Sequence, residues 1–149
     1  SREAPVSDAT VSTSEAGAPI DIGAFLADTN ATIAEVLETR VRALTVRAFR
    51  KEIDAVVAEL PSSPKSARAR GIAAHLIGND RRAADLLGKA GDDPRTRHIL
   101  GRALIGAGRF EEAAEVLAEL EKSEPNSRPA HAEALLRSND PSGAWNVIG

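Results

Sequence analysis

A pattern of helix starts recurs along the C-terminal two-thirds of the chain, and it limits the possible folds more than any other feature. Each start places a capping side chain beside a proline, which suits the first position of a helix. The cases are Ser63-Pro64, Asp93-Pro94 and Asp140-Pro141, with Ser127 before Pro129 as a looser fourth. Turns about 30 residues apart separate the helices, at Gly78-Asn79-Asp80, Gly106-Ala107-Gly108-Arg109 and Ser138-Asn139-Asp140. The pattern therefore predicts a stack of helical hairpins over residues 64–149.

The side chains available for a core also favour helices. Hydrophobic residues make up 42% of the chain but aromatic residues only 3%, so the core must be mainly aliphatic. Alanine and leucine are strong helix formers, whereas the aromatic residues that are enriched in strands are scarce. A small alanine follows each turn and lets two helices approach closely, at Ala83, Ala113 and Ala144. We therefore expect an all-α fold.

Residues 94–127 resemble one tetratricopeptide repeat, a hairpin unit of about 34 residues. The matching positions are Leu100-Gly101 on the first helix, the turn glycine Gly108, the aromatic Phe110, the small crossing residue Ala113, and then Leu117, Leu120 and Pro125. Leu104 and Arg97 depart from the family pattern, and the hairpins on either side are degenerate copies. The resemblance implies an α-α superhelix of about three repeats over residues 64–148. Another helical-repeat array or an unrelated helical bundle are the alternatives.

The N-terminal part of the chain has a different pattern. Residues 1–20 are rich in Ser, Ala, Thr and Pro without a helical period, which predicts a flexible tail or linker; alternatively, the tail docks in the protein's own groove. A short helix is expected over residues 22–27. Thr29 or Asn30 is then expected to cap one long helix that reaches Leu60, with a break possible near Val46. Its apolar stripe comprises Ile33, Val36, Leu37, Val41, Leu44, Ala48, Phe49, Ile53, Val56, Val57 and Leu60.

The family resemblance implies where a partner would bind. In tetratricopeptide arrays the first helix of each hairpin lines a concave groove. The residues carried onto these positions are mostly basic: Lys65, Arg68, His75, Arg95, His98, Arg102 and Arg128. Such a groove would suit an acidic segment or a C-terminal carboxylate of another protein. The asparagines of the family's known carboxylate clamp are absent from these positions, and scattered surface arginines are the alternative interpretation.

Two further surfaces are candidates for contacts with other chains. Glu111, Glu115 and Glu119 share one helix face, which is either a solvated outer face or a docking strip for a basic partner. The last hairpin ends with Trp145, Val147 and Ile148, whereas terminal repeats normally present a polar face. Self-assembly through this end, or through the long N-terminal helix, is therefore the alternative to a partner-binding role.

The sequence offers no catalytic or metal-binding constellation. His75, His98 and His131 have neither the spacing nor the neighbouring ligands of a zinc site, and the chain contains no cysteine. The glycines at 101, 106 and 108 lack the GK[ST] ending of a phosphate loop. We expect a protein that is not an enzyme and uses no cofactor. Its net charge of −3 also makes a nucleic-acid partner unlikely.

Two features of the sequence bear on compartment and processing. No apolar run reaches the roughly 20 residues that a membrane-spanning helix needs, and no signal-peptide pattern is present. Because the chain contains no methionine, we expect it to be a processed product or part of a longer protein. The bias towards arginine and alanine is typical of a GC-rich bacterial genome. A soluble protein on either the cytoplasmic or the extracytoplasmic side fits these observations.

Overall fold

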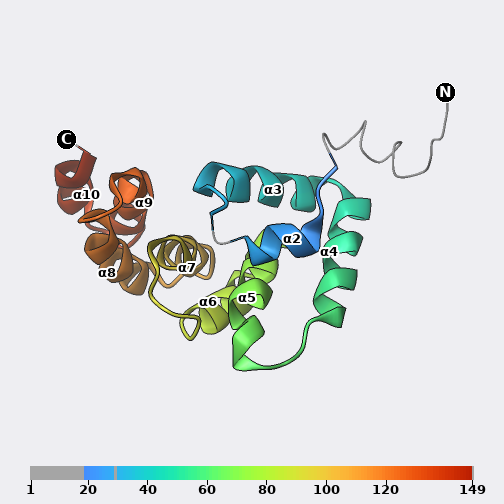
Figure 1. Cartoon of the computed structure of the whole chain (residues 1–149). Helices are drawn as coiled ribbons and strands as arrows, with labels where there is room; N and C mark the ends of the chain where they lie inside the picture. Colours follow the sequence, from blue (N-terminus) through green and yellow to red (C-terminus); the bar gives the residue numbers. More distant parts are fainter. Residues whose placement is uncertain (1–18, 29, 149) are drawn as a thin grey trace.

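The computed structural model describes residues 19–28 and 30–148, and within these ranges every regular element is helical. Three helical hairpins follow one another: α5 (Ala67–Leu76) with α6 (Asp80–Leu87), α7 (Pro94–Gly106) with α8 (Phe110–Glu121), and α9 (Arg128–Arg137) with α10 (Pro141–Ile148). Short 3-10 turns, η2 (Pro64–Ser66) and η3 (Pro125–Ser127), precede α5 and α9. The expected all-α stack of hairpins is confirmed (Figure 1).

The three turns within the hairpins share one backbone structure. Gly78, Gly108 and Asn139 each have a positive φ, of 85°, 80° and 66°. The next residue in each turn donates its backbone N–H to the carbonyl five positions back, at 2.8 Å in all three cases. This is the hydrogen bond of a Schellman cap, which satisfies the last carbonyls of the first helix. The turns that the sequence predicted are therefore real and equivalent.

Glycines on the first helices set how closely the second helices pack. A Cβ placed on Gly71 would lie 2.7 Å from Cγ of Leu87, and one on Gly101 would lie 2.6 Å from Cγ of Leu117. Both leucines are fully buried. The same glycine–leucine contact therefore closes the first two hairpins, and the larger Ala132 stands at the corresponding place in the third, seven residues before Asn139.

The helix starts were only partly predicted. Asp93 accepts a hydrogen bond from the backbone N–H of Thr96 at 3.1 Å, and Asp140 accepts one from Gly143 at 2.9 Å. Ser63 and Ser127 make no capping hydrogen bond. The hydroxyl of Ser127 instead donates to the carbonyl of Glu124 at 2.7 Å. This local bond explains why Ser127 does not cap the helix, and the interpretation of both serines as side-chain caps was wrong.

The described part of the N-terminal segment forms three helices: α2 (Ile22–Ala27), α3 (Ile33–Thr45) and α4 (Arg47–Glu59). The predicted short helix is confirmed as α2. The cap of α3 is Thr32 rather than Asn30, because Thr32 and Glu35 form a reciprocal capping box with hydrogen bonds of 3.1 and 2.8 Å. The other expected cap, Thr29, lies outside the described residues, as does nearly all of the expected tail over residues 1–20.

The prediction of a single long helix up to Leu60 was wrong, although the helix breaks at Val46, where the sequence indicated a possible break. Val46 is extended, with φ −118° and ψ 106°, and α4 leaves it in a new direction (Figure 1). The hydroxyl of Thr45 donates back to the carbonyl of Val41 at 2.8 Å, an interaction that often bends helices. As a result, three members of the predicted apolar stripe are exposed: Val41, Leu44 and Ala48.

The N-terminal helices pack on the first helices of the hairpins. α2 contacts α4 and α5, while α3 contacts both α5 and α7. Leu26, Phe49 and Ile53 are buried in the same core cluster as Ile72 and Leu76, so α2 and α4 are integral to the domain. α3 therefore lies over the face of the array on which the sequence placed an open groove (Figure 1).

Candidate protein-binding site

A cavity of about 340 Å³ lies where α3 meets the first helices of all three hairpins. Its lining residues are Leu37 and Arg40 from α3, His75 from α5, Arg102, Ile105 and Gly106 from α7, and Glu133 and Arg137 from α9. The wall is polar, with three arginines against one carboxylate. An anionic group is therefore the ligand chemistry that this cavity favours.

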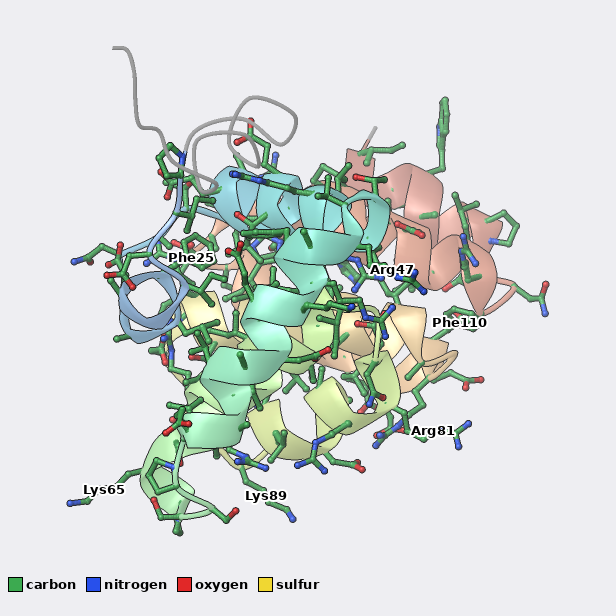
Figure 2. All side chains as sticks on the ribbon, turned by 90° about the vertical axis from the view of Figure 1, so that its right-hand side faces the viewer. Phe25, Arg47, Lys65, Arg81, Lys89 and Phe110 are labelled. Carbon is green, nitrogen blue, oxygen red and sulfur yellow. The ribbon has the colours of Figure 1, made fainter. Side chains whose placement is uncertain are left out.

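The seven predicted groove residues do not form one surface. Only His75 and Arg102 line the cavity. His98 is fully buried beneath Arg102, and Arg95 is half-buried on the first turn of α7. Lys65 projects into solvent from η2 (Figure 2). Arg128 forms an ion pair with Glu121 at 3.2 Å, away from the cavity-lining residues.

Arg68 interacts with the protein's own N-terminal segment. Its Nε donates to Oγ1 of Thr96 at 3.0 Å, and its guanidinium also reaches the carbonyl of Leu26, at the end of α2, at 3.4 Å. The same Thr96 hydroxyl donates to Asp93, the cap of α7, at 2.6 Å. Arg68 therefore joins α2, α5 and α7.

The strongest polar interaction of the site was not predicted. Arg40 on α3 makes a two-pronged ion pair with Asp80 at the start of α6, with nitrogen–oxygen distances of 3.1 and 3.0 Å. It also donates to the backbone carbonyl of His75. Nδ1 of His75 lies 2.6 Å from Oδ1 of Asp80. Asp80 and His75 are buried and Arg40 is mostly covered, so this cluster attaches α3 to the hairpin array.

The charge states within this cluster follow from its geometry. Burial alone would raise the pKa of Asp80, but hydrogen bonds from His75 and Arg40 hold that pKa below its ordinary value. Burial, together with nearby Arg40, lowers the pKa of His75 even though Asp80 opposes the shift. Neutral His75 therefore donates from Nδ1 to ionised Asp80. Its Nε2 is buried and has no hydrogen-bond partner among the described residues.

Gly106 was the one sequence signal for this cluster. A Cβ at this position would collide with the carboxylate of Asp80, so only glycine leaves room for the pair. Sequence reasoning attributed the glycines at 106 and 108 to one turn. Gly108 is the turn residue, with its positive φ, whereas Gly106 makes space for Asp80.

Arg102 is the least satisfied charge in the cavity. It is half-buried, and its Nε donates to Nε2 of His98 at 3.1 Å. Among the described residues it has no ion pair, in contrast to Arg40 with Asp80 and Arg137 with Glu133. Burial lowers the pKa of Arg102, and the more distant charge of Glu133 opposes this shift. An unpaired cation in a cavity is a direct candidate for binding an anion.

The predicted acidic face is exposed on α8, the outer helix of the second hairpin. Glu119 forms an exposed ion pair with Lys122 at 3.2 Å, while Glu111 and Glu115 have no ion pair within the described part of the chain. Glu119 also lines a second cavity of about 580 Å³ with Lys89, Arg97 and Asp92. Because its charges are mixed, this cavity favours no single ligand.

Within residues 19–28 and 30–148, no group of three His, Cys, Asp or Glu residues is arranged to hold a metal ion. None of the helices in these ranges is both long and apolar enough to cross a membrane.

Comparison with known proteins agrees with the repeat pattern. A sequence model of the tetratricopeptide repeat matches residues 78–138, which contain the turn of the first hairpin, the whole second hairpin and α9. A solved structure titled "MamA MSR-1 C2" is similar, with a TM-score of 0.56 and 22% sequence identity over 84% of this chain and 80% of that one. None of the curated proteins matches in sequence.

The protein is therefore tetratricopeptide-repeat-like, as the sequence predicted. Such repeats generally form non-catalytic folds that bind other proteins, so the match supports a protein-interaction or scaffold module. The likeness to the solved structure shows the fold alone.

The buried histidines predict how stability depends on pH. Burial, and then Arg102 and Arg95, lower the pKa of His98 from 6.5 to about 4. Between these values the unfolded chain holds a proton on His98 that the folded protein does not, so the free energy of unfolding should fall as the pH falls. His75 acts in the same direction. Urea denaturation at pH 7, 6 and 5 measures this dependence.

The variant His98→Gln is the matched comparison, because it keeps a hydrogen-bond acceptor for Arg102 without a titrating group. It should lose part of the decrease in stability between pH 7 and pH 5, with His75 responsible for the remainder. A free energy of unfolding in the wild type that stays constant or rises as the pH falls over this range would contradict the prediction.

Proposed function

We propose that this protein is a non-catalytic interaction module that binds an acidic segment or a C-terminal carboxylate of another protein in the cavity between α3, α5, α7 and α9. The observation that carries the proposal is Arg102, a half-buried cation in this cavity that has no ion pair among the described residues. A carboxylate that bonds a guanidinium can gain two parallel charge-assisted hydrogen bonds, each roughly twice as strong as a neutral hydrogen bond.

The surroundings of Arg102 support the same ligand. Arg40 and Arg137 line the same cavity, but the carboxylate partner of each largely cancels its charge, so Arg102 supplies the net positive charge of the cavity. Leu37 and Ile105 supply apolar surface beside them. A peptide that places one carboxylate on Arg102 could therefore rest aliphatic side chains on this surface.

The proposed site is shorter than the groove the sequence suggested. Arg68 bonds to the end of α2, and Arg40 of α3 covers His75. A partner segment thus meets mainly α7 and α9, with α3 as the opposite wall. Arg102 is the one member of the predicted set that is both in the cavity and without a carboxylate.

A charge reversal tests this site. Peptides that end in a free carboxylate are selected for wild-type binding from a display library, and their affinities are then measured by calorimetry. Arg102→Glu should weaken binding at least about tenfold, because it replaces the bonding cation with a repelling anion. Arg81→Glu makes the same change on the outer helix α6, where the side chain projects into solvent (Figure 2), and should change affinity less than about twofold.

Peptides with an amidated C-terminus and no acidic side chain serve as the ligand control and should not bind. Equal affinity for wild type and Arg102→Glu would remove the cavity from consideration, and so would equal losses in the two charge reversals.

Self-assembly is a second candidate function, favoured by apolar side chains exposed at the last hairpin. Trp145 is 71% exposed, Ile148 57% and Leu136 54%. Val41 and Leu44, 61% and 49% exposed on α3, are the other large exposed apolar side chains of the described residues, and both lie on a predicted assembly surface. Grouped exposed apolar residues are typical of protein–protein contacts. We infer that a second copy could stack on the α9–α10 end.

Light scattering over a concentration series tests this second function. If the α9–α10 end mediates assembly, the mass of the wild type should rise with concentration, and Trp145→Ser with Ile148→Ser should keep the protein monomeric. Val41→Ser removes an equally exposed apolar side chain from α3 and should leave assembly unchanged. A wild type that is monomeric at every concentration would exclude self-assembly through either surface.

A further inference from the structure

α3 lies on the first helices of the hairpins as a bound partner helix would. Three of its residues, at spacings of three and four, face the array: Leu37 lines the cavity, Arg40 bonds Asp80, and Leu44 reaches the turn at Gly78. A Cβ on Gly78 would lie 3.1 Å from Cδ2 of Leu44. Anchors at i, i+3 and i+7 are the usual contacts of an amphipathic helix held in a groove.

The pocket that receives Arg40 is built by the array itself. Asp80 is fixed by His75 at 2.6 Å, and the missing side chain of Gly106 leaves space for its carboxylate. The carbonyl of His75 supplies a further acceptor for the same guanidinium. The groups that bind Arg40 therefore belong to α5 and α6, and Gly106 of α7 leaves the space that they need. Together these groups form a guanidinium-binding site.

α3 is amphipathic, with one face against the array and the other in solvent. Val36 and Ala43 are each 2% exposed and belong to the core cluster, whereas Val41 is 61% exposed. Val46 at one end of α3 is extended, and Asn30 and Ala31 before its cap lie outside any helix. α3 therefore begins and ends at non-helical residues, which can absorb a change in backbone angles if the helix moves.

We propose that the surface under α3 is a binding site for an amphipathic partner helix that carries an arginine, and that α3 is its built-in competitor. The partner's arginine would enter the pocket formed by Asp80 and His75, and a leucine one turn before it would take the place of Leu37. This inference rests on the proposed interaction role of the array, but it concerns Asp80 rather than Arg102. Because α3 is tethered at an effective concentration on the order of millimolar, it limits access to the site.

A labelled peptide with the sequence of residues 31–46 is the probe, and fluorescence anisotropy measures its binding to the full chain. The wild type should bind it weakly, since α3 occupies the site. Arg40→Ala in the protein removes the main contact of α3 and should tighten apparent binding at least about tenfold. Thr32→Ala weakens α3 only through its cap, leaves the site intact, and should tighten binding by a smaller factor.

Two controls decide whether the probe occupies the proposed pocket. The same peptide with Arg40→Ala should bind at least about tenfold more weakly than the unchanged peptide to the Arg40→Ala protein. Adding Asp80→Asn to that protein should cause a similar loss. Circular dichroism and urea denaturation establish whether each variant is folded. If Arg40→Ala does not fold, Thr32→Ala serves as the variant with a weakened α3.

The proposal is overturned if the peptide does not bind a folded variant with a weakened α3, or if it binds without regard to its arginine or to Asp80. The effect of Arg102→Glu on carboxylate peptides is measured separately. Either site can therefore fail while the other stands.

Discussion

The arrangement of this protein depends on the ion pair between Arg40 and Asp80. Arg40 comes from α3 in the N-terminal segment, and Asp80 begins the second helix of the first hairpin, 40 residues later. His75 completes the cluster from α5, and Gly106 of α7 provides the space. A buried carboxylate without its cation is strongly unfavourable, so the pair specifies one place for α3. It thereby determines which part of the basic surface stays open and which part the chain covers itself.

This constraint changes which ligands the basic groove predicted from the sequence could bind. A uniform row of cations would attract acidic segments along its whole length. The proposed binding sites instead lie around two groups of opposite charge: Arg102, which has no ion pair among the described residues, and Asp80, which is paired with Arg40. Leu37 and Arg40 of α3 line the cavity that holds Arg102, and Arg40 also occupies the pocket at Asp80. A change in the position of α3 would therefore affect both proposed sites.

Local signals in the sequence predicted the hairpin array well. The Schellman turns at Gly78, Gly108 and Asn139, and the caps at Asp93 and Asp140, depend on a few neighbouring residues. The bend at Val46 was harder to predict, because the apolar spacing of threes and fours continues through it while Phe49 and Ile53 turn towards α2 and α5. The Arg40–Asp80 pair could not be predicted, since nothing local links two charges 40 positions apart. The one sequence signal for this pair is Gly106, and the sequence alone does not distinguish it from a glycine that forms a turn.

The central claim is that Arg40 and Asp80 attach α3 to the hairpin array, and a double-mutant cycle tests it most directly. The free energy of unfolding is measured by urea denaturation for the wild type, Arg40→Ala, Asp80→Ala and the double variant at pH 7. The predicted coupling energy is about 2 kcal/mol, because each single change leaves the other charge without its partner. Single effects that add to within about 0.5 kcal/mol would show that the two residues do not interact, and would contradict the proposed role of α3.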